Sequence, residues 1–243
     1  AEKMSSLGQL TAGIAHEIRN PLVGIGSTTS LLLEDTDSQD TRRPDLELIL
    51  QETKRLDRIV NQIIDYARPR EIVTVPFDLA ALVQEVAKVL DEPLTKKQVG
   101  LTVAAPPSPP ILQADRDQLK QVLLNIVQNA LDASSAGQTL EILISLHDHG
   151  IEPGLNLSVV DHGVGISPAH LPHVFEPFFT SGKRQGTGLG LAICRNILEA
   201  HGGDITLESA PGQGTTVRMW IPLRQQPRIQ GDLAHAGHDL RHG

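Results

Sequence analysis

The sequence predicts an α+β multidomain protein in which an antiparallel helical hairpin precedes an α/β sandwich with a mostly antiparallel sheet. Two runs of apolar residues at helical spacing open the chain. After them, helical and strand patterns mix without strict βαβ alternation, and a strand pair with a glycine-containing turn closes the series. Aromatic residues make up 2% and hydrophobic residues 40% of the 243 residues, so the core must consist mainly of Leu, Ile, Val and Ala.

The first two helices form the hairpin, which we assign to residues 1–70. In the first helix, apolar residues recur every three or four positions from Leu7 to Leu32, and a polar turn over residues 35–43 ends it. The second helix carries a heptad seam at Leu46, Ile49, Thr53, Leu56, Val60, Ile63 and Ala67. Because a single hairpin cannot cover both apolar stripes, we expect two copies of the chain to pair into a four-helix bundle, as a homodimer.

The second domain is assigned to residues 71–223. Asp78 follows a connector bracketed by Pro69 and Pro76 and is expected to cap a helix that runs to about Leu94. The elements expected next are, in order, a strand near residues 99–103, a helix over 117–134, strands over 140–146 and 155–160, a helix over 188–200 and a hairpin over 204–223. Residues 224–243 show no period and are expected to form a disordered tail.

Composition and charge narrow the possible partners. A formal net charge of −8 argues against a general nucleic-acid or anionic-membrane binder. No run approaches the ~20 apolar residues of a membrane span, and no signal peptide opens the chain, so we expect this segment to lie in the cytoplasm without membrane contact. The chain starts inside a helical pattern, which indicates an upstream sensor domain and leaves open a membrane anchor in the full-length protein. Cys194 is expected to be an inert core thiol.

A histidine on the first helix is the first candidate for chemistry. His16 lies two residues from both Ile14 and Ile18, about 200° around the helix from each, so it must face outward. Asn20 follows at i+4 on the same face, and Glu17 is an adjacent acid that can take or orient the imidazole proton. Pro21 is expected to bend the helix near this point. Taken alone, His16 is better explained as a surface histidine on a helix.

A second group of polar and glycine residues is typical of a phosphate pocket. Asn125 and Asn129 stand at i,i+4, so their amide oxygens converge as a magnesium ion bridging phosphates would require, although a solvated helix face has the same pattern. Asp161 follows a strand and precedes two glycines, which suits either a carboxylate that accepts from an adenine amine or a plain tight turn. The stretch from Gly186 to Gly190 opens a helix and favours an anion, with neither dinucleotide-binding nor Walker spacing.

These segments together resemble one family. Residues 16–22, His-Glu-Ile-Arg-Asn-Pro-Leu, resemble the phosphoacceptor box of sensor histidine kinases. In order, QVLLNIVQNALDA, DHGVGI, FEPFFTS, GTGLGLA and GQGTT resemble the N, G1, F, G2 and G3 boxes of the ATP-binding domain that these kinases share with a wider ATPase superfamily of Bergerat-type fold. The resemblance extends from about Leu7 to Leu223.

The resemblance implies a role for each matching residue. His16 would accept the phosphoryl group, Glu17 would support it, and Asn20 would position water for dephosphorylating a partner. Asn125 and Asn129 would hold Mg²⁺. The implied ATP-binding residues are Asn125, Asn129, Asp132, Asp161, Gly163, Gly165, Ile166, Thr180, Lys183, Gly186, Thr187, Gly188, Leu189, Gly190 and Thr215. Phe175, Phe178 and Phe179 would anchor a lid in which Lys183 and Arg184 reach the phosphates.

The implied function is autophosphorylation from ATP and Mg²⁺ onto His16, followed by transfer to an aspartate of a response regulator. Asp132 stands where many histidine kinases have a lysine, and Asn125 stands where ATP-hydrolysing relatives have a glutamate, which favours transfer over hydrolysis. Two alternatives stay open. One is a serine kinase or ATPase of the same superfamily, and the other is an ATP-binding dimer scaffold or dedicated phosphatase.

Overall fold

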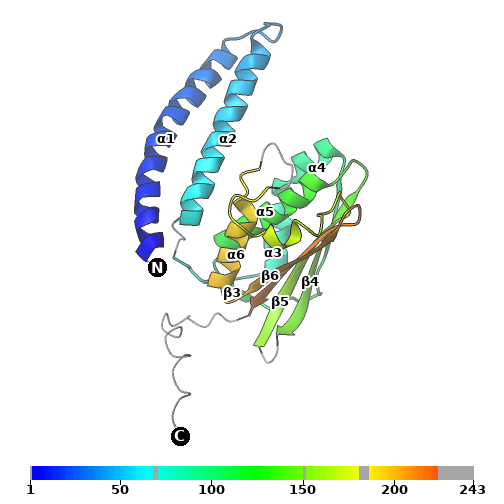
Figure 1. Cartoon of the computed structure of the whole chain (residues 1–243). Helices are drawn as coiled ribbons and strands as arrows, with labels where there is room; N and C mark the ends of the chain where they lie inside the picture. Colours follow the sequence, from blue (N-terminus) through cyan, green and yellow to red (C-terminus); the bar gives the residue numbers. More distant parts are fainter. Residues whose placement is uncertain (1, 68–70, 150–151, 181–185, 224–243) are drawn as a thin grey trace.

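A computed structural model describes the backbone of residues 2–67, 71–149, 152–180 and 186–223, and the side chains of these residues except 2–16, 148 and 149. The predicted tail over residues 224–243 therefore lies outside the described residues. Figure 1 shows a long helical hairpin standing beside a layered α/β domain, with the helices of that domain between the hairpin and the sheet. None of the helices in the described ranges is long and apolar enough to span a membrane.

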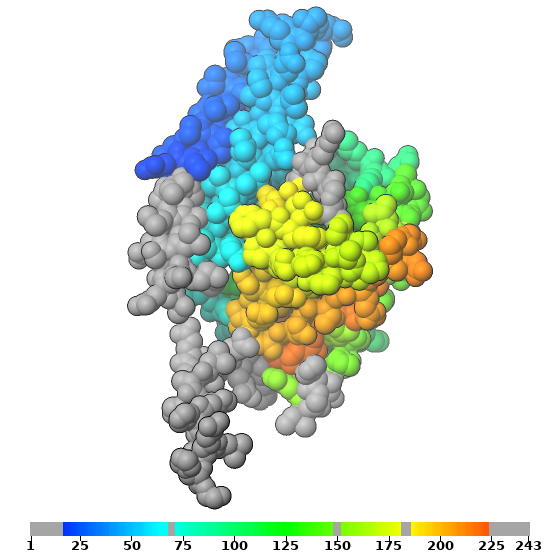
Figure 2. Space-filling model, viewed as in Figure 1, coloured from blue at the N-terminus to red at the C-terminus, as the bar shows by residue number. Residues whose placement is uncertain are grey.

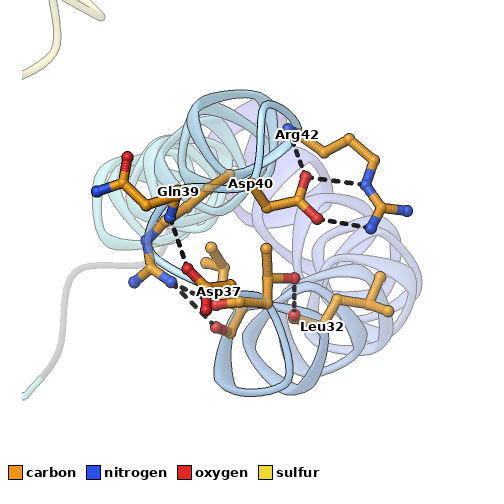
Figure 3. Close-up of polar contacts among 8 residues, drawn as sticks. Leu32, Asp37, Gln39, Asp40 and Arg42 are labelled. Atoms are coloured by element: carbon orange, nitrogen blue, oxygen red, sulfur yellow. Dashed lines mark hydrogen bonds and ion pairs between the residues drawn. The ribbon is translucent and has the colours of Figure 1, made fainter.

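The hairpin consists of α1, Glu2–Glu34, and α2, Arg43–Ala67. Its turn is held by side-chain contacts drawn in Figure 3, where Arg42 forms an ion pair with Asp40 at 2.7 Å. This hydrogen-bonded pair lowers the pKa of the Asp40 carboxyl to about 2. The guanidinium of Arg43 donates to the carbonyl oxygens of Thr36 at 2.9 Å and Leu33 at 3.4 Å, which satisfies acceptors that the end of α1 leaves open.

Apolar side chains of the hairpin are only partly covered. Leu22 and Val60 are buried between the two helices, with Ile64 packed against them. Much of the predicted seam stays exposed, including Ile49 at 44% and Leu56 at 46%. The first helix continues through Pro21, and in Figure 1 it is bowed along its length without a break.

The segment after the connector differs from the predicted single helix. Asp78 is the expected N-cap, and its Oδ1 accepts from the backbone N–H of Ala80 at 2.8 Å. The helix is divided, however, into α3, Leu79–Val89, and α4, Asp91–Lys97. Pro93 explains the division, because it lacks the N–H that a continuous helix would donate to the carbonyl of Val89. The prediction of one helix to about Leu94 was therefore wrong.

The sheet has five strands in the order β2-β4-β5-β7-β6. Their bounds are Gly100–Ala104 for β2, Thr139–His149 for β4, Glu152–Asp161 for β5, Asp204–Ala210 for β6 and Gly214–Pro222 for β7. Only β2 and β4 run parallel, which confirms the predicted mostly antiparallel sheet. A separate pair that the sequence did not predict, β1 (Val75–Phe77) with β3 (Leu112–Ala114), joins the connector to the domain.

One face of the sheet is covered by α3, α5 (Arg116–Ala133) and α6 (Gly190–Ala200), as Figure 1 shows. The buried core between these layers is aliphatic, as the composition predicted, and includes Leu82, Leu123, Ile126, Leu157 and Leu198. A short 3₁₀ helix, Leu171–His173, lies between β5 and α6 in the chain. Cys194 is fully buried in this core, and burial raises the pKa of its thiol to about 12, which confirms the expected core cysteine.

Candidate functional site

A pocket with a volume of about 540 Å³ lies where α5, the ends of the central strands and the loops around α6 meet one face of α2. In Figure 2 the cyan half of α2 stands directly beside the yellow and orange segments that lead into and form α6. The predicted ATP-binding residues on its wall are Asn125, Asn129, Asp132, Asp161, Gly165, Ile166, Thr180, Gly186, Thr187, Gly188, Gly190 and Thr215. Residues of the predicted N, G1, G2 and G3 boxes thus line one pocket, together with Thr180 of the F box.

Three predicted residues are not among the described residues that line the pocket. Gly163 lies behind the pocket wall, in the turn after β5, where its backbone N–H donates to Oδ1 of Asp161 at 2.9 Å. Leu189 is 1% exposed and packs into the core, so it anchors the glycine turn to the core. Lys183, with Arg184, lies outside the described residues.

One end of the pocket is formed where β5 ends beside the start of β7. Asp161, the last residue of β5, is 5% exposed and pairs in register with Thr215 of β7. Thr215 Oγ1 is 3.0 Å from Oγ of Ser209, and that hydroxyl accepts from the N–H of Ile166 at 2.8 Å. Gly165 has φ +67, and a Cβ there would lie 1.9 Å from the carbonyl oxygen of Ala210, so only glycine fits this turn.

The opposite end is the glycine turn before α6. Gly188 has φ +70, and its carbonyl accepts from the N–H of Phe178 at 3.0 Å. A Cβ on Gly188 would lie 2.4 Å from the backbone of Phe178, so a larger residue would push the turn out of place. The helix α6 starts at Gly190, and its free N–H groups and dipole favour an anion at this end of the pocket.

The polar face of α5 forms the wall between the two ends. Asn125 and Asn129 both line the pocket one helical turn apart, and Oδ1 of Asp132 accepts from Nε2 of Gln128 at 2.8 Å. Amide oxygens are ligands that Mg²⁺ accepts together with phosphate oxygens. The described residues contain no group of three or more His, Cys, Asp or Glu residues suited to a metal. A cation at this wall would therefore take its other ligands from a bound polyphosphate and water.

The three predicted lid anchors behave differently. Phe175 packs against the core, with the Arg195 guanidinium 4.0 Å from its ring centroid. Phe179 lines the pocket, with its ring centroid 5.6 Å from that of His170. Phe178 is 66% exposed and has φ +66, so its side chain is not buried in this structure, and its predicted role at a lid stays a prediction. Phe178 instead contributes its backbone N–H to the glycine turn.

The sequence analysis missed a fourth wall of the pocket. It is a stripe on α2 at i, i+3, i+4 and i+7, made of Arg55, Arg58, Ile59 and Gln62. Gln62 Oε1 accepts from the Thr187 hydroxyl at 2.7 Å. Two arginines on a face away from the predicted heptad seam, in a chain with net charge −8, were the signal that could have identified this wall.

A second hydrogen bond joins α2 to the layered domain. Asp65 Oδ2 accepts from Nε2 of Gln121 on α5 at 3.0 Å, less than one turn beyond Gln62. Ile63 and Tyr66 also pack against the domain core from the same end of α2. The hairpin is therefore docked against the pocket domain by both polar and apolar contacts.

The described side chains of the predicted phosphoacceptor turn do not line this pocket. Glu17 and Asn20 are exposed on α1, and the side chain of His16 lies outside the described side chains. The same turn is joined to α2 by Arg19, which donates to Oδ1 of Asn61 and pairs with Asp57 at 3.6 Å. Asp57 and Asn61 lie about 150° and 110° around α2 from the centre of the pocket stripe, so α2 stands between the histidine box and the pocket.

Comparison with protein-family models identifies both parts. Residues 6–72 match the His Kinase A (phospho-acceptor) domain, and residues 114–225 match the histidine kinase-, DNA gyrase B-, and HSP90-like ATPase domain. Fold and pocket thus define an ATPase-type domain joined to a phosphoacceptor hairpin. The chain belongs to the sensor histidine kinase family.

Individual relatives agree with this assignment. The sensor histidine kinase ZraS of Escherichia coli K12 is 36% identical over 222 residues, which cover 91% of this chain and 47% of ZraS. The chain therefore spans about half the length of that relative. Full-length ShkA in complex with AMPPNP is similar with a TM-score of 0.76 and 28% identity, over 90% of this chain and 46% of ShkA. Histidine kinase ThkA in complex with the response regulator TrrA has a TM-score of 0.64 and 32% identity, over 92% and 64%.

Proposed function

We propose that this chain is the autophosphorylating core of a sensor histidine kinase, which transfers the γ-phosphoryl group of ATP to His16 and then to an aspartate of a response regulator. The observation that carries the proposal is the pocket of about 540 Å³ whose wall combines the predicted nucleotide-binding boxes with the hairpin that bears the histidine box. The AMPPNP complex of ShkA supports ATP as the ligand, and the ThkA–TrrA complex supports a response regulator as the partner.

Each end of the pocket has a role in this proposal. The buried carboxylate of Asp161 accepts a hydrogen bond from the adenine amino group. The N–H groups of the turn from Gly186 to Gly190 bind the phosphates at the start of α6. The amides of Asn125 and Asn129 hold Mg²⁺, which supplies neutralisation of phosphate charge when bound. The chain's own residues thus bind and orient the triphosphate.

The transfer forms one bond and breaks one. An imidazole nitrogen of His16 attacks the γ-phosphorus, the bond to the β-phosphate oxygen breaks, and ADP leaves. Glu17 takes or orients the proton on the other imidazole nitrogen. Because α2 stands between the histidine box and the pocket, the pocket domain must move relative to the hairpin before transfer, or serve the partner subunit's hairpin. The resulting N–P bond then breaks as a regulator carboxylate takes the phosphoryl group.

The remaining features complete the proposed enzyme. Residues 1–70 form the dimerisation and phosphoacceptor hairpin, and residues 71–223 form the ATP-binding domain. The active form is a homodimer that receives its signal from an upstream sensor domain. Asn20 is exposed one turn from His16, which supports a further role in positioning water for dephosphorylating the regulator.

Labelled ATP tests the proposal directly. The chain is incubated with Mg²⁺ and γ-labelled ATP, and acid-labile, base-stable label on the protein is measured. We expect label on the native chain, none on His16→Gln, and native levels on the control His147→Gln, which removes an exposed histidine of β4. Nucleotide binding is measured in parallel on all three proteins. Label that survives in His16→Gln, or a native chain that binds ATP and never becomes labelled with an activating sensor domain attached, contradicts the proposal.

A further inference from the structure

The positive charge on the described pocket wall comes from the hairpin. Among the described lining residues, the cationic side chains are Arg55 and Arg58, and both belong to α2. The layered domain contributes the carboxylates of Asp132 and Asp161 to the same wall. A polyphosphate bound there would meet two acidic groups of its own domain and two guanidinium groups of the neighbouring one.

The arginines stand near the phosphate end of the pocket. Gln62 is hydrogen-bonded to Thr187, which lies in the glycine turn before α6. Arg58 precedes Gln62 by one helical turn on the same face of α2, about 6 Å along the axis, and Arg55 precedes it by two turns. The docking contacts of α2 therefore hold Arg58 one turn, and Arg55 two turns, from the point where α2 meets the glycine turn, and both arginines line the same pocket.

Among the described residues, no lysine of the layered domain supplies positive charge to the pocket wall. Asp132 occupies the place on α5 where the resemblance leads us to expect a lysine. The ammonium of Lys97 lies near that turn, but it donates to the carbonyl oxygens of Leu131 at 2.7 Å and Asp132 at 3.0 Å, at the end of α5. It is not on the pocket wall.

We propose that Arg55 and Arg58 bind the β- and γ-phosphates from the hairpin side, so that a nucleoside triphosphate joins the two domains and loss of its γ-phosphoryl group weakens the junction. Guanidinium groups suit this role because their planar N–H donors match phosphate oxygens. Arg55 also pairs with Glu52 at 2.9 Å, which holds its side chain on the pocket side of α2. The inference rests on the proposed ATP-binding function and adds regulation of domain docking to it.

Calorimetric titration of the full chain with Mg²⁺-AMPPNP and with Mg²⁺-ADP tests this inference. The variants are the double substitution Arg55→Gln/Arg58→Gln, the double substitution Arg55→Lys/Arg58→Lys, and Lys54→Gln. Lys54 is an exposed cation on the same helix that does not line the pocket, so its variant removes one positive charge without touching the site.

We expect the Gln double variant to bind AMPPNP about tenfold or more weakly, as the loss of charge-assisted phosphate contacts predicts, and ADP only about two- to threefold more weakly. The Lys double variant should recover part of the AMPPNP affinity, and Lys54→Gln should bind both nucleotides within about twofold of the native chain. A Gln double variant with native AMPPNP affinity overturns the inference and leaves the proposed function standing. An equal loss for AMPPNP and ADP also overturns it. A native chain that binds neither nucleotide refutes the proposed function itself.

Discussion

Among single residues, His201 has the environment most sensitive to protonation. It ends α6 with 1% of its surface exposed. Its Nε2 accepts from the backbone N–H of Asp115 at 3.1 Å, so the proton of the neutral ring must sit on Nδ1, which lies 2.7 Å from the carbonyl oxygen of Ile197. Burial lowers the pKa of His201 below its ordinary value of 6.5, against the opposing effects of the Ile197 carbonyl and the Asp115 carboxylate.

This shift predicts a loss of stability in mild acid. Above pH 6.5 His201 is neutral in both states and its contribution is complete. Below that pH the unfolded chain binds a proton that the folded chain resists, so the free energy of unfolding falls by up to about 1.4 kcal/mol per pH unit until the folded pKa is reached. Urea denaturation between pH 8 and pH 5.5 should show this slope reduced in His201→Gln and unchanged in His147→Gln. Equal slopes in all three proteins would mean that another group controls the transition.

At the scale of elements, two aspartates begin helices in different surroundings. Asp78 caps α3 through one hydrogen bond to Ala80, on a partly exposed side chain. Asp115 caps α5 and is 8% exposed, and its carboxylate accepts from the N–H groups of Asp117 at 3.1 Å and Gln118 at 3.0 Å. Its other oxygen accepts from the N–H of Val73 in the connector at 2.9 Å. Asp115 therefore joins a helix start to the segment that leads in from the hairpin.

The difference predicts unequal losses of stability. Asp78→Ala should lower the free energy of unfolding by about 1 kcal/mol, the usual effect of removing an N-cap. Asp115→Ala should lower it by about 2–3 kcal/mol, because the part-buried hydrogen bond from the N–H of Val73 is lost together with the cap. Equilibrium urea unfolding measures both, with Asp117→Ala as a control for an exposed acid in the first turn of α5. Losses of the same size for Asp78 and Asp115 would show that the bond to Val73 contributes nothing.

Most elements of this fold are predictable because their signals are local. Alternating apolar residues identified β2, β4 and β5, and Asp78 identified the start of α3. The end of α3 at Val89 also had a local signal, Pro93. The helical spacing of apolar residues continues on both sides of Pro93, however, and this obscured the break. The β1–β3 pair could not be predicted, because each strand has only three residues and forms only when the connector meets a segment 35 to 39 residues further along the chain, from the pairing of Phe77 with Leu112 to that of Val75 with Ala114.

At the scale of the whole molecule, α2 presents three faces. One packs on α1 through Val60 and Asp57, and one borders the pocket through Arg58 and Gln62. The boxes of the layered domain were predictable because each is a short motif. The arginine wall was harder to predict, because Arg55 and Arg58 mark a cationic face of α2 but nothing within α2 indicates which domain that face will meet. The third face carries exposed apolar residues and has no covering segment among the described residues.

The exposed apolar residues of the hairpin, on α1 as well as on the third face of α2, predict that the chain forms a dimer. Exposed large apolar side chains are concentrated on the hairpin, at Ile18, Val23, Ile25, Leu31, Leu32, Leu48, Ile49 and Leu56. If two hairpins pair about a two-fold axis through the side that carries Ile18, Ile25, Leu32, Ile49 and Leu56, these residues become buried in both copies, and each fully buried Leu or Ile stabilises the pair by about 1.5–3 kcal/mol. We therefore expect a stable dimer in solution.

Sedimentation of the double variant Ile49→Gln/Leu56→Gln measures the contribution of this seam. Since four apolar side chains are lost per dimer, we expect the dissociation constant to rise by about 100-fold or more, even if each contributes only part of its transfer free energy. The matched control is Val89→Gln, an apolar residue of α3 that is 53% exposed outside the hairpin, and it should leave the dimer unchanged. A double variant that sediments as the native dimer at every concentration would place the interface elsewhere, and a monomeric native chain would rule out the four-helix bundle.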